Sequence, residues 1–213
     1  MEGFSKSLSK LGELILFILV SIIYTSLILL PMILINLMLE DSLISYIFLF
    51  IPLIGLLGIS LEREFISVRE VFIKRTPYYK PYFSKVFSKG FLKKYLVYCL
   101  IFSLFFYADD SLRILEGENF ILFVFRIFLD LALINMIFYT ILQKAYREDL
   151  TFIKTSKNSL ILTGKFPIQS IIVGFVWLVF QNLVYRNSFW TLGLVIIMGF
   201  MGTFINEIKI KKL

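Results

Sequence analysis

Long apolar runs alternate with charged connections along this chain. The runs predict six membrane-spanning helices, because about 20 consecutive apolar residues cross the hydrocarbon core of a bilayer as an α-helix. The third run, at 95–108, is short, and we expect its helix to start near Phe91, with Lys93 and Lys94 reaching back to the membrane interface. The predicted spans are 14–39, 42–61, 91–108, 120–143, 166–184 and 188–206.

The first run has the length of a retained span rather than of a signal peptide. No charged residue occurs between Leu14 and Leu39, and the run has no small-residue cleavage site. Pro31 predicts a kink within this span. We therefore predict an all-α fold: an integral membrane bundle of about six transmembrane helices, in a single polytopic membrane domain covering residues 1–213.

Composition supports the same class and excludes several kinds of chemistry. Hydrophobic residues make up 59% of the chain, against about 45–50% in an average soluble domain. The chain has no His and a single Cys, Cys99, which excludes an intrachain disulfide, a Cys/His zinc site and a His-based triad. Phosphate-binding loops and hydrolase motifs are also missing from the sequence. We expect no enzymatic activity, no metal and no cofactor.

Basic residues gather in segments that would share one side of the membrane. Of 22 Lys and Arg residues, all but Arg113, Arg126 and Arg186 lie near the N-terminus, in the 62–94 and 144–165 connections, or in the C-terminal tail. The opposite connections contain mainly acids: Glu40, Asp41, Asp109, Asp110, Glu116 and Glu118.

This distribution predicts the orientation of the bundle. Lys and Arg in short loops remain in the cytoplasm, so we expect a multi-pass protein of the cytoplasmic membrane with both termini inside. The anionic lipids of the inner leaflet are then its expected partners. A nucleic-acid partner is disfavoured, because the basic charge follows the membrane borders and no recognition motif accompanies it.

The 62–94 connection predicts a cytoplasmic amphipathic helix between spans 2 and 3. From Tyr79 onward, aromatic and apolar residues recur at helical spacing, and Lys and Ser residues take the other face. Such a helix lies on the inner leaflet; the alternative is that its surface docks a membrane protein partner or a second copy of the chain. The candidate lipid- or partner-binding surface consists of Tyr79, Lys80, Tyr82, Phe83, Lys85, Phe87 and Lys89.

The start of the same connection carries charges of both signs. Three acids, Glu62, Glu64 and Glu70, are interspersed with Arg63 and Arg69. Such alternation is typical of a helix face in contact with solvent. We therefore expect this segment to be exposed, and we do not expect its acids to form a metal site.

Two ionisable residues, Arg126 and Asp130, lie inside the fourth span. Their i,i+4 spacing places them on one helix face, where each can neutralise the other. Asp130 lies about 15 Å into the span by helical rise, close to the middle of the bilayer. Charges at that depth either fix helix packing or mark a polar pathway that contacts a substrate. Coupled proton transport usually needs more acids, and no transporter-type internal repeat occurs.

Three segments carry a resemblance to a known family. They are a proline and small-residue run that closes the second span, at 52–63, an aromatic and basic stretch at 78–87, and a Lys-Asn-Ser-Leu stretch that ends at a proline, at 157–167. In this order they resemble the YesL-like bacterial membrane proteins, a family of unknown function. The chain departs from that family in lacking alanines near Gly55 and a Trp in the aromatic stretch.

The resemblance implies a location in the bacterial cytoplasmic membrane and a link to carbohydrate uptake, and it supplies no catalytic residues. Our first hypothesis is a non-enzymatic accessory, linked to carbohydrate uptake or to the cell envelope through its cytoplasmic aromatic and basic surface. The alternative is a substrate-binding component of a membrane transport system, with a site near Arg126 and Asp130. A six-span vitamin-uptake subunit is disfavoured, because the small-residue contact of its first span is missing here.

Overall fold

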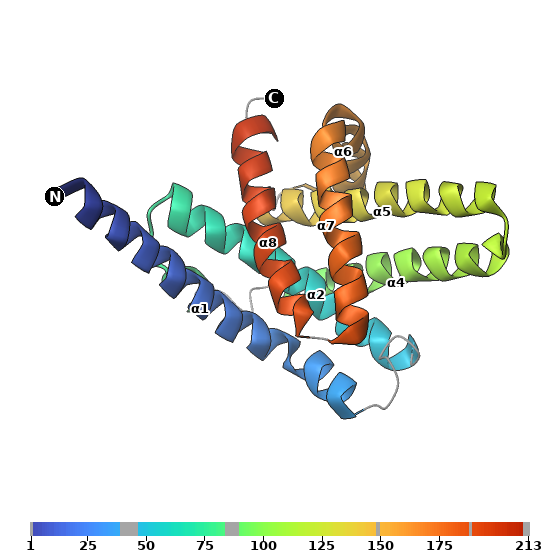
Figure 1. Ribbon diagram of the computed structural model, residues 1–213, viewed down its shortest axis with the longest axis horizontal. Coiled ribbons are helices and arrows are strands. Elements are labelled where there is room, and N and C mark those ends of the chain that lie inside the picture. The colour runs from blue at the N-terminus through green and yellow to red at the C-terminus, as the bar shows by residue number, and fades with distance from the viewer. Residues whose placement is uncertain (1, 39–46, 84–89, 148–149, 188, 211–213) are drawn as a thin grey trace.

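The computed structural model describes residues 2–38, 47–83, 90–147, 150–187 and 189–210 (Figure 1). Helices form all the regular secondary structure of these residues, which confirms the all-α prediction. In chain order they are α1 (Glu2–Met38), α2 (Ile47–Val68) followed by the π-helical turn η2 (Arg69–Ile73), α3 (Lys80–Phe83), α4 (Phe91–Glu116), α5 (Phe120–Tyr146), α6 (Phe152–Lys165), α7 (Pro167–Arg186), and α8 (Trp190–Ile205) followed by the π-helical turn η3 (Asn206–Ile210).

Within the described residues, five helices are long and apolar enough to cross a membrane. They fit a multi-pass membrane protein, since a span needs about 20 predominantly apolar residues. The largest differences from the predicted bounds of these five spans are in α1, which begins at Glu2, well before residue 14, and in α4, which ends at Glu116 instead of 108. The five candidate spans are Ser9–Ile35, Phe91–Glu116, Phe120–Tyr146, Pro167–Val184 and Trp190–Ile208.

α2 differs from the predicted second span. Residues 42–46, where the sequence predicts that span to begin, lie outside the described residues. The helix then continues past Leu61 through Glu62, Arg63 and Glu64 to Val68. Its C-terminal part is therefore charged rather than apolar, and α2 is not one of the five candidate spans. The count of six spans stays a prediction.

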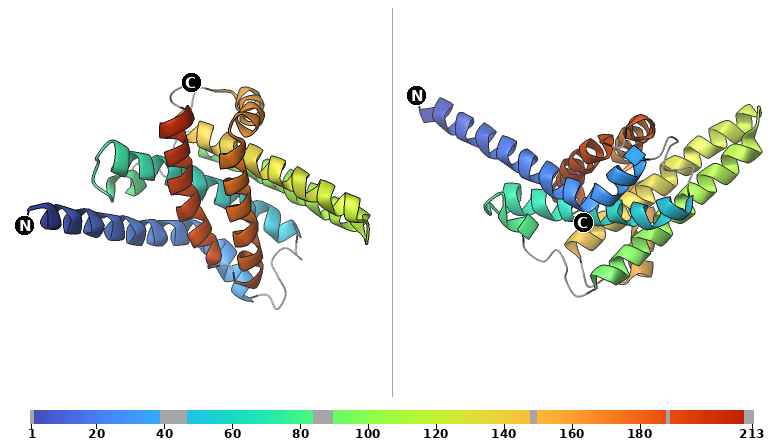
Figure 2. Two further views of the ribbon diagram at one scale, coloured as in Figure 1. Left: turned by 45° about the horizontal axis from the view of Figure 1, so that its top comes forward. Right: turned by 90° about the horizontal axis from the view of Figure 1, so that it is seen from below.

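Two parts of the chain extend from a central bundle. α7 and α8 run side by side as an antiparallel pair, with α8 packed on α2 and α7 packed on α5 (Figure 1). The antiparallel hairpin of α4 and α5 extends to one side, and the N-terminal part of α1 extends to the other (Figures 1 and 2). The two halves of α5 therefore have different surroundings: ten of the eleven buried residues of this helix lie between Ile134 and Ala145, in the bundle.

The core lies where α2, α4, α5 and α8 meet. The side chains of Phe65 and Leu142 are fully buried there. Two glycines let the helices approach closely. A Cβ atom on Gly202 would lie 2.3 Å from the Phe65 ring, and one on Gly58 would lie 2.6 Å from the Tyr98 ring. Glycines at helix contacts are typical of membrane proteins, in which close van der Waals packing holds the helices together.

A polar junction joins the ends of α2, α5 and α8. The Tyr146 hydroxyl lies 2.9 Å from both the Phe65 carbonyl, to which it donates, and the Thr203 hydroxyl. The Arg69 Nε lies 3.2 Å from the Glu207 Oε1, and the Arg69 guanidinium lies 4.6 Å above the Tyr146 ring. Arg69 and Glu207 belong to the π-helical turns η2 and η3, so this ion pair ties the end of α2 to the end of α8.

Candidate functional site in the α4–α5 hairpin

A turn formed by residues 117–119 joins α4 to α5. Gly117 has a φ of 48°, in the left-handed region that favours glycine. Asn119 caps the start of α5: its Oδ1 accepts from the backbone N–H groups of Ile121 and Leu122 at 3.0 and 3.3 Å. Because the turn is short, the last part of α4 lies directly beside the first part of α5.

The extension of α4 changes the position of acids that the sequence assigns to an external connection. Asp109, Asp110 and Glu116 all lie on the helix instead. Asp109 and Glu116 are seven residues apart, about two helical turns, so they share one face of α4. Asp110 is exposed, whereas Asp109 and Glu116 are half-buried. The hairpin thus brings two acids that the sequence placed outside the spans next to α5.

Arg126 is the cation that joins the two helices. Its Nε lies 2.7 Å from the Glu116 Oε2, and its Nη1 lies 3.5 Å from the Asp109 Oδ1. The guanidinium also lies 5.8 Å from the centre of the Phe123 ring, within the range of a cation–π contact. The Arg126, Asp109 and Glu116 side chains are 18%, 17% and 15% exposed, so these ion pairs form in largely enclosed surroundings.

Asp130 lies one turn further along α5 and is buried, with 6% of its surface exposed. Its carboxyl group is within hydrogen-bonding reach of the Asp109 carboxyl group, and Arg126 and Glu116 are its other charged neighbours. Its Oδ1 has no hydrogen-bond donor among the described residues. We call Asp109, Glu116, Arg126 and Asp130 the hairpin cluster.

The ion pair predicted between Arg126 and Asp130 is not the one that forms. Both side chains belong to the hairpin cluster, as their i,i+4 spacing on one face predicts. Among the described residues, however, the ion pairs of Arg126 are with Glu116 and Asp109. The reason is geometric: side chains on an α-helix lean toward its N-terminus, so the long Arg126 side chain extends toward the turn and Glu116, away from Asp130.

The exterior of this hairpin is apolar. Leu104, Ile121 and Phe128 expose 60%, 76% and 69% of their surfaces. In water such exposure would be unfavourable, whereas lipid chains cover apolar side chains without penalty. A polar interior within an apolar exterior is the arrangement expected of ionisable groups in a membrane, which face the protein rather than the lipid.

Two acids of α2 are buried, which corrects the prediction of a solvated face. Glu62 and Glu64 are 5% and 1% exposed. The Lys94 Nζ lies 2.5 Å from the Glu62 Oε1, and the Tyr98 hydroxyl donates to the other Glu62 oxygen. The Ser21 hydroxyl donates to the Glu64 Oε2 at 2.8 Å. The continuation of α2 past its apolar part carries both acids into the bundle, where α1 and α4 supply their partners.

The predicted lipid- or partner-binding surface lies partly within the described residues. Tyr79 is 52% exposed and Lys80 is also exposed. An Arg63 guanidinium nitrogen donates to the Pro81 carbonyl and thereby holds α3 against α2. The predicted amphipathic helix stays a prediction, because part of it lies outside the described residues: the side chains of Tyr82 and Phe83, and the residues Lys85, Phe87 and Lys89.

A buried hydrogen-bond network joins α5 to α6. The Ser159 Oγ accepts from the Thr140 hydroxyl at 3.0 Å and from the Gln143 side-chain amide at 2.9 Å. The Ser159 hydroxyl in turn donates to the Thr155 carbonyl at 2.8 Å. The network supplies acceptors for the side-chain N–H groups of Gln143, which the sequence places within an apolar span.

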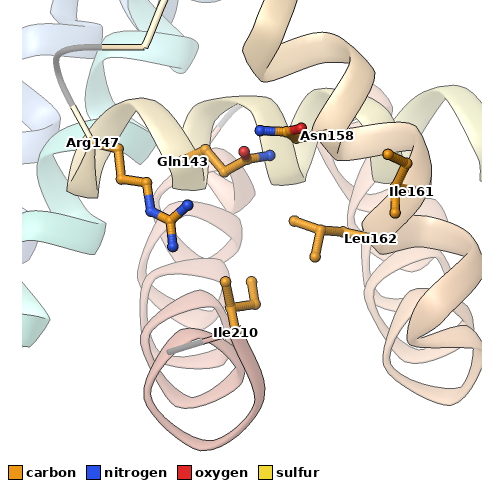
Figure 3. A pocket seen from close by; sticks show the side chains of 6 residues that line it. All are labelled: Gln143, Arg147, Asn158, Ile161, Leu162 and Ile210. Carbon is orange, nitrogen blue, oxygen red and sulfur yellow. The ribbon is translucent and has the colours of Figure 1, made fainter. Parts of the chain in front are cut away.

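A pocket of about 270 Å³ lies beside this network, between α5, α6 and η3 (Figure 3). Figure 3 shows Gln143 between Arg147 and Asn158. The volume is slightly below the range of about 300–1,000 Å³ typical of small-molecule sites. The sequence gives little signal for this pocket, since its residues come from separate segments: Gln143, Arg147, Asn158, Ile161, Leu162 and Ile210.

Comparisons with known proteins give this chain no relative. No family model matches the sequence, no curated protein matches it, and no solved structure matches the fold. The resemblance to the YesL-like family therefore stays a prediction based on three segments of the sequence.

Proposed function

We propose that this chain is a non-enzymatic accessory component of a bacterial cytoplasmic-membrane system. The observation that supports this role is how the charges inside the apolar helices are used. Arg126 binds two acids of the neighbouring helix, and all three side chains are less than one-fifth exposed. Charged side chains that pair with one another between two helices stabilise the helix packing of a scaffold. A substrate site instead needs polar groups that face an open cavity.

The proposed orientation follows from the basic residues. In this proposal α2 is the sixth span beside the five apolar helices, so both termini lie on one side of the membrane, and the Lys and Arg residues of the connections keep that side in the cytoplasm. In this orientation the turn at Gly117 is external. α6, with Lys154, Lys157 and Lys165, lies at the cytoplasmic border together with the pocket beside Arg147.

The cytoplasmic surface is the proposed contact with lipid headgroups or with a partner. Tyr79 and Lys80 are exposed at the start of α3, and basic residues next to a span are attracted to anionic lipids or to an acidic protein surface. A link to carbohydrate uptake or to the cell envelope comes from the resemblance of residues 52–63, 78–87 and 157–167 alone. This resemblance indicates which class of partner to test: components of a carbohydrate-uptake or cell-envelope system.

Photo-crosslinking in cells tests the accessory role. A photoreactive phenylalanine derivative replaces Tyr79, and a matched sample carries it in place of Glu118, which is exposed at the external turn. We expect position 79 to yield an adduct with a component of a sugar-uptake or cell-envelope system, and Lys80→Glu in the same chain to lower its yield. Adducts with lipid alone at both positions would contradict a protein partner at this surface.

A substrate-binding transport component is the second candidate. It is favoured by the excess of acid in the hairpin cluster, which contains three carboxyl groups and one guanidinium. The two roles differ in the effect of Asp130→Asn. In an accessory, the crosslink at Tyr79 and the activity of the partner system should both survive this change. In a transport component, the crosslink should survive and uptake should be lost.

A further inference from the structure

The hairpin cluster contains more acid than its cation can neutralise. A guanidinium stays protonated at every physiological pH, so Arg126 contributes one positive charge. Asp109, Glu116 and Asp130 would contribute three negative charges if all were ionised, which leaves a net charge of −2 between two apolar helices. An uncompensated charge of this size is strongly unfavourable away from water.

Asp130 is the member whose surroundings fit an ionised carboxylate least. It is the most deeply buried of the four, and its Oδ1 has no donor among the described residues. The charged groups that face it are Asp109 and Glu116 of α4 and Arg126 of its own helix. Arg126 forms its ion pairs with the two α4 acids, so in the part of the chain that the structure describes no cation is paired directly with Asp130.

The contact between Asp130 and Asp109 has a chemical requirement of its own. An ionised carboxylate has acceptors and no donor, so two carboxylates within hydrogen-bonding reach repel one another. When one carboxyl group keeps its proton, it donates to the other, and the pair carries a single negative charge. That remaining charge, on Asp109, lies beside the Arg126 Nη1.

We propose that Asp130 and Asp109 form a proton-binding site inside the apolar hairpin, with one proton shared between the two carboxyl groups. Asp130 carries the proton and donates it to the Asp109 carboxylate, while Arg126 balances the charges of Asp109 and Glu116. The site goes beyond the accessory role and does not depend on it.

The proposal assigns a reversible reaction to the hairpin. When the pH rises, the shared proton leaves to solvent, and the pair becomes two carboxylates that repel one another across the α4–α5 contact. When the pH falls, the proton returns. The turn end of this hairpin extends away from the bundle (Figure 1), so the two helices can respond to that repulsion without unpacking the core.

Carbodiimide labelling of the full-length protein in mild detergent tests the site. Dicyclohexylcarbodiimide accepts the proton of a neutral carboxyl group on nitrogen while the carboxyl oxygen adds to its central carbon, and the adduct rearranges to a stable acylurea. Mass spectrometry then locates the product. We expect modification at Asp130 or Asp109 at neutral pH, with a yield that falls as pH rises. Glu118, exposed at the turn, is the internal control and should stay unmodified.

Asp109→Asn is the deciding variant. The new amide can donate to the Asp130 carboxylate, so Asp130 no longer needs a proton, and most of its labelling should be lost. Glu118→Gln should leave labelling unchanged. Undiminished labelling of Asp130 in the Asp109→Asn protein would overturn the shared-proton pair, because Asp130 would then be neutral through burial alone.

The infrared spectrum of the wild-type protein gives a readout that does not depend on access of the reagent or on the folding of a variant. The wild-type protein at neutral pH should show the C=O stretching band of a protonated carboxyl group, and this band should weaken as the pH is raised. Asp130→Asn should remove it. A wild-type spectrum without such a band at neutral pH would refute the proposal.

Discussion

The Arg126 Nε lies 2.7 Å from the Glu116 Oε2, across the turn that joins α4 to α5. Glu116 ends one helix and Arg126 lies in the second turn of the next. Because the helices are antiparallel and side chains lean toward the helix N-terminus, the arginine meets an acid of the other helix and not the acid four positions later in its own.

Replacing Arg126 with Gln should destabilise the protein. Glu116 and Asp109 would lose their cation while staying largely enclosed, and breaking a buried ion pair by removing one partner costs about 3–5 kcal/mol. With 18% of the arginine side chain exposed, we expect a loss at the lower end of that range. The measurement is the midpoint of unfolding in detergent, compared with that of the wild-type protein.

Double substitutions identify the partner of the arginine. Adding Glu116→Gln to Arg126→Gln removes a stranded acid and should restore part of the lost stability. Adding Asp130→Asn should restore little, because Asp130 is not an ion-pair partner of Arg126 within the described residues. If the lost stability returned only when Asp130→Asn was combined with Arg126→Gln, the α4 acids would not be the partners of Arg126.

Gly199→Ala tests the close contact between α8 and the buried acid of α2. A Cβ atom on Gly199 would lie 2.3 Å from the Glu64 Cγ, and Glu64 is fixed by the hydrogen bond from Ser21. Overpacking of this kind costs about 1–3 kcal/mol. Gly12→Ala in α1 is the matched control, since nothing lies within 4 Å of a Cβ atom there. The control should stabilise the helix by up to about 1 kcal/mol. Equal unfolding midpoints for the two variants would contradict the packing of α8 on Glu64.

Ser159→Ala tests the network that joins α5 to α6. The change removes the acceptor of the Thr140 hydroxyl and of the Gln143 amide. A buried polar group left without its partner costs about 1–3 kcal/mol, and we expect a loss of that size in thermal unfolding. Ser156→Ala, on a less buried position of the same helix, should change stability by no more than about 0.5 kcal/mol. If the Ser159→Ala and Ser156→Ala proteins unfold at the same temperature, the Ser159 hydrogen bonds do not stabilise the α5–α6 contact.

The sequence predicts an element well where a local signal marks its boundary. The predicted starts of the fourth and fifth spans, at 120 and 166, lie within one residue of the starts of α5 and α7, where the structure shows the N-cap residue Asn119 and the first-turn residue Pro167. An N-cap side chain and a proline with fixed φ act on their immediate neighbours, so neither depends on the rest of the fold. The all-α fold class follows from the apolar runs in the same way.

The burial of charged residues could not be predicted, because their partners are distant in sequence. Glu62 is enclosed by Lys94 and Tyr98, which follow it by 32 and 36 positions. Asp109 meets Arg126 after 17 positions, across a turn. Hydropathy assigns a charge to the aqueous side because an isolated charge is costly to bury. Hydropathy contains no information on the hydrogen bonds and ion pairs that offset this cost once the helices pack.

Two-sided labelling with an impermeant maleimide tests the membrane topology most directly. Cys99, the only cysteine of the chain, is first replaced with Ala, and Glu118→Cys and Lys157→Cys are then made separately at exposed positions of the α4–α5 turn and of α6. In intact cells the reagent should label the Glu118→Cys protein and leave the Lys157→Cys protein unlabelled until the membrane is opened. Labelling of both proteins in intact cells, or of the Lys157→Cys protein alone, would contradict a membrane bundle with its hairpin turn outside and its basic connections inside.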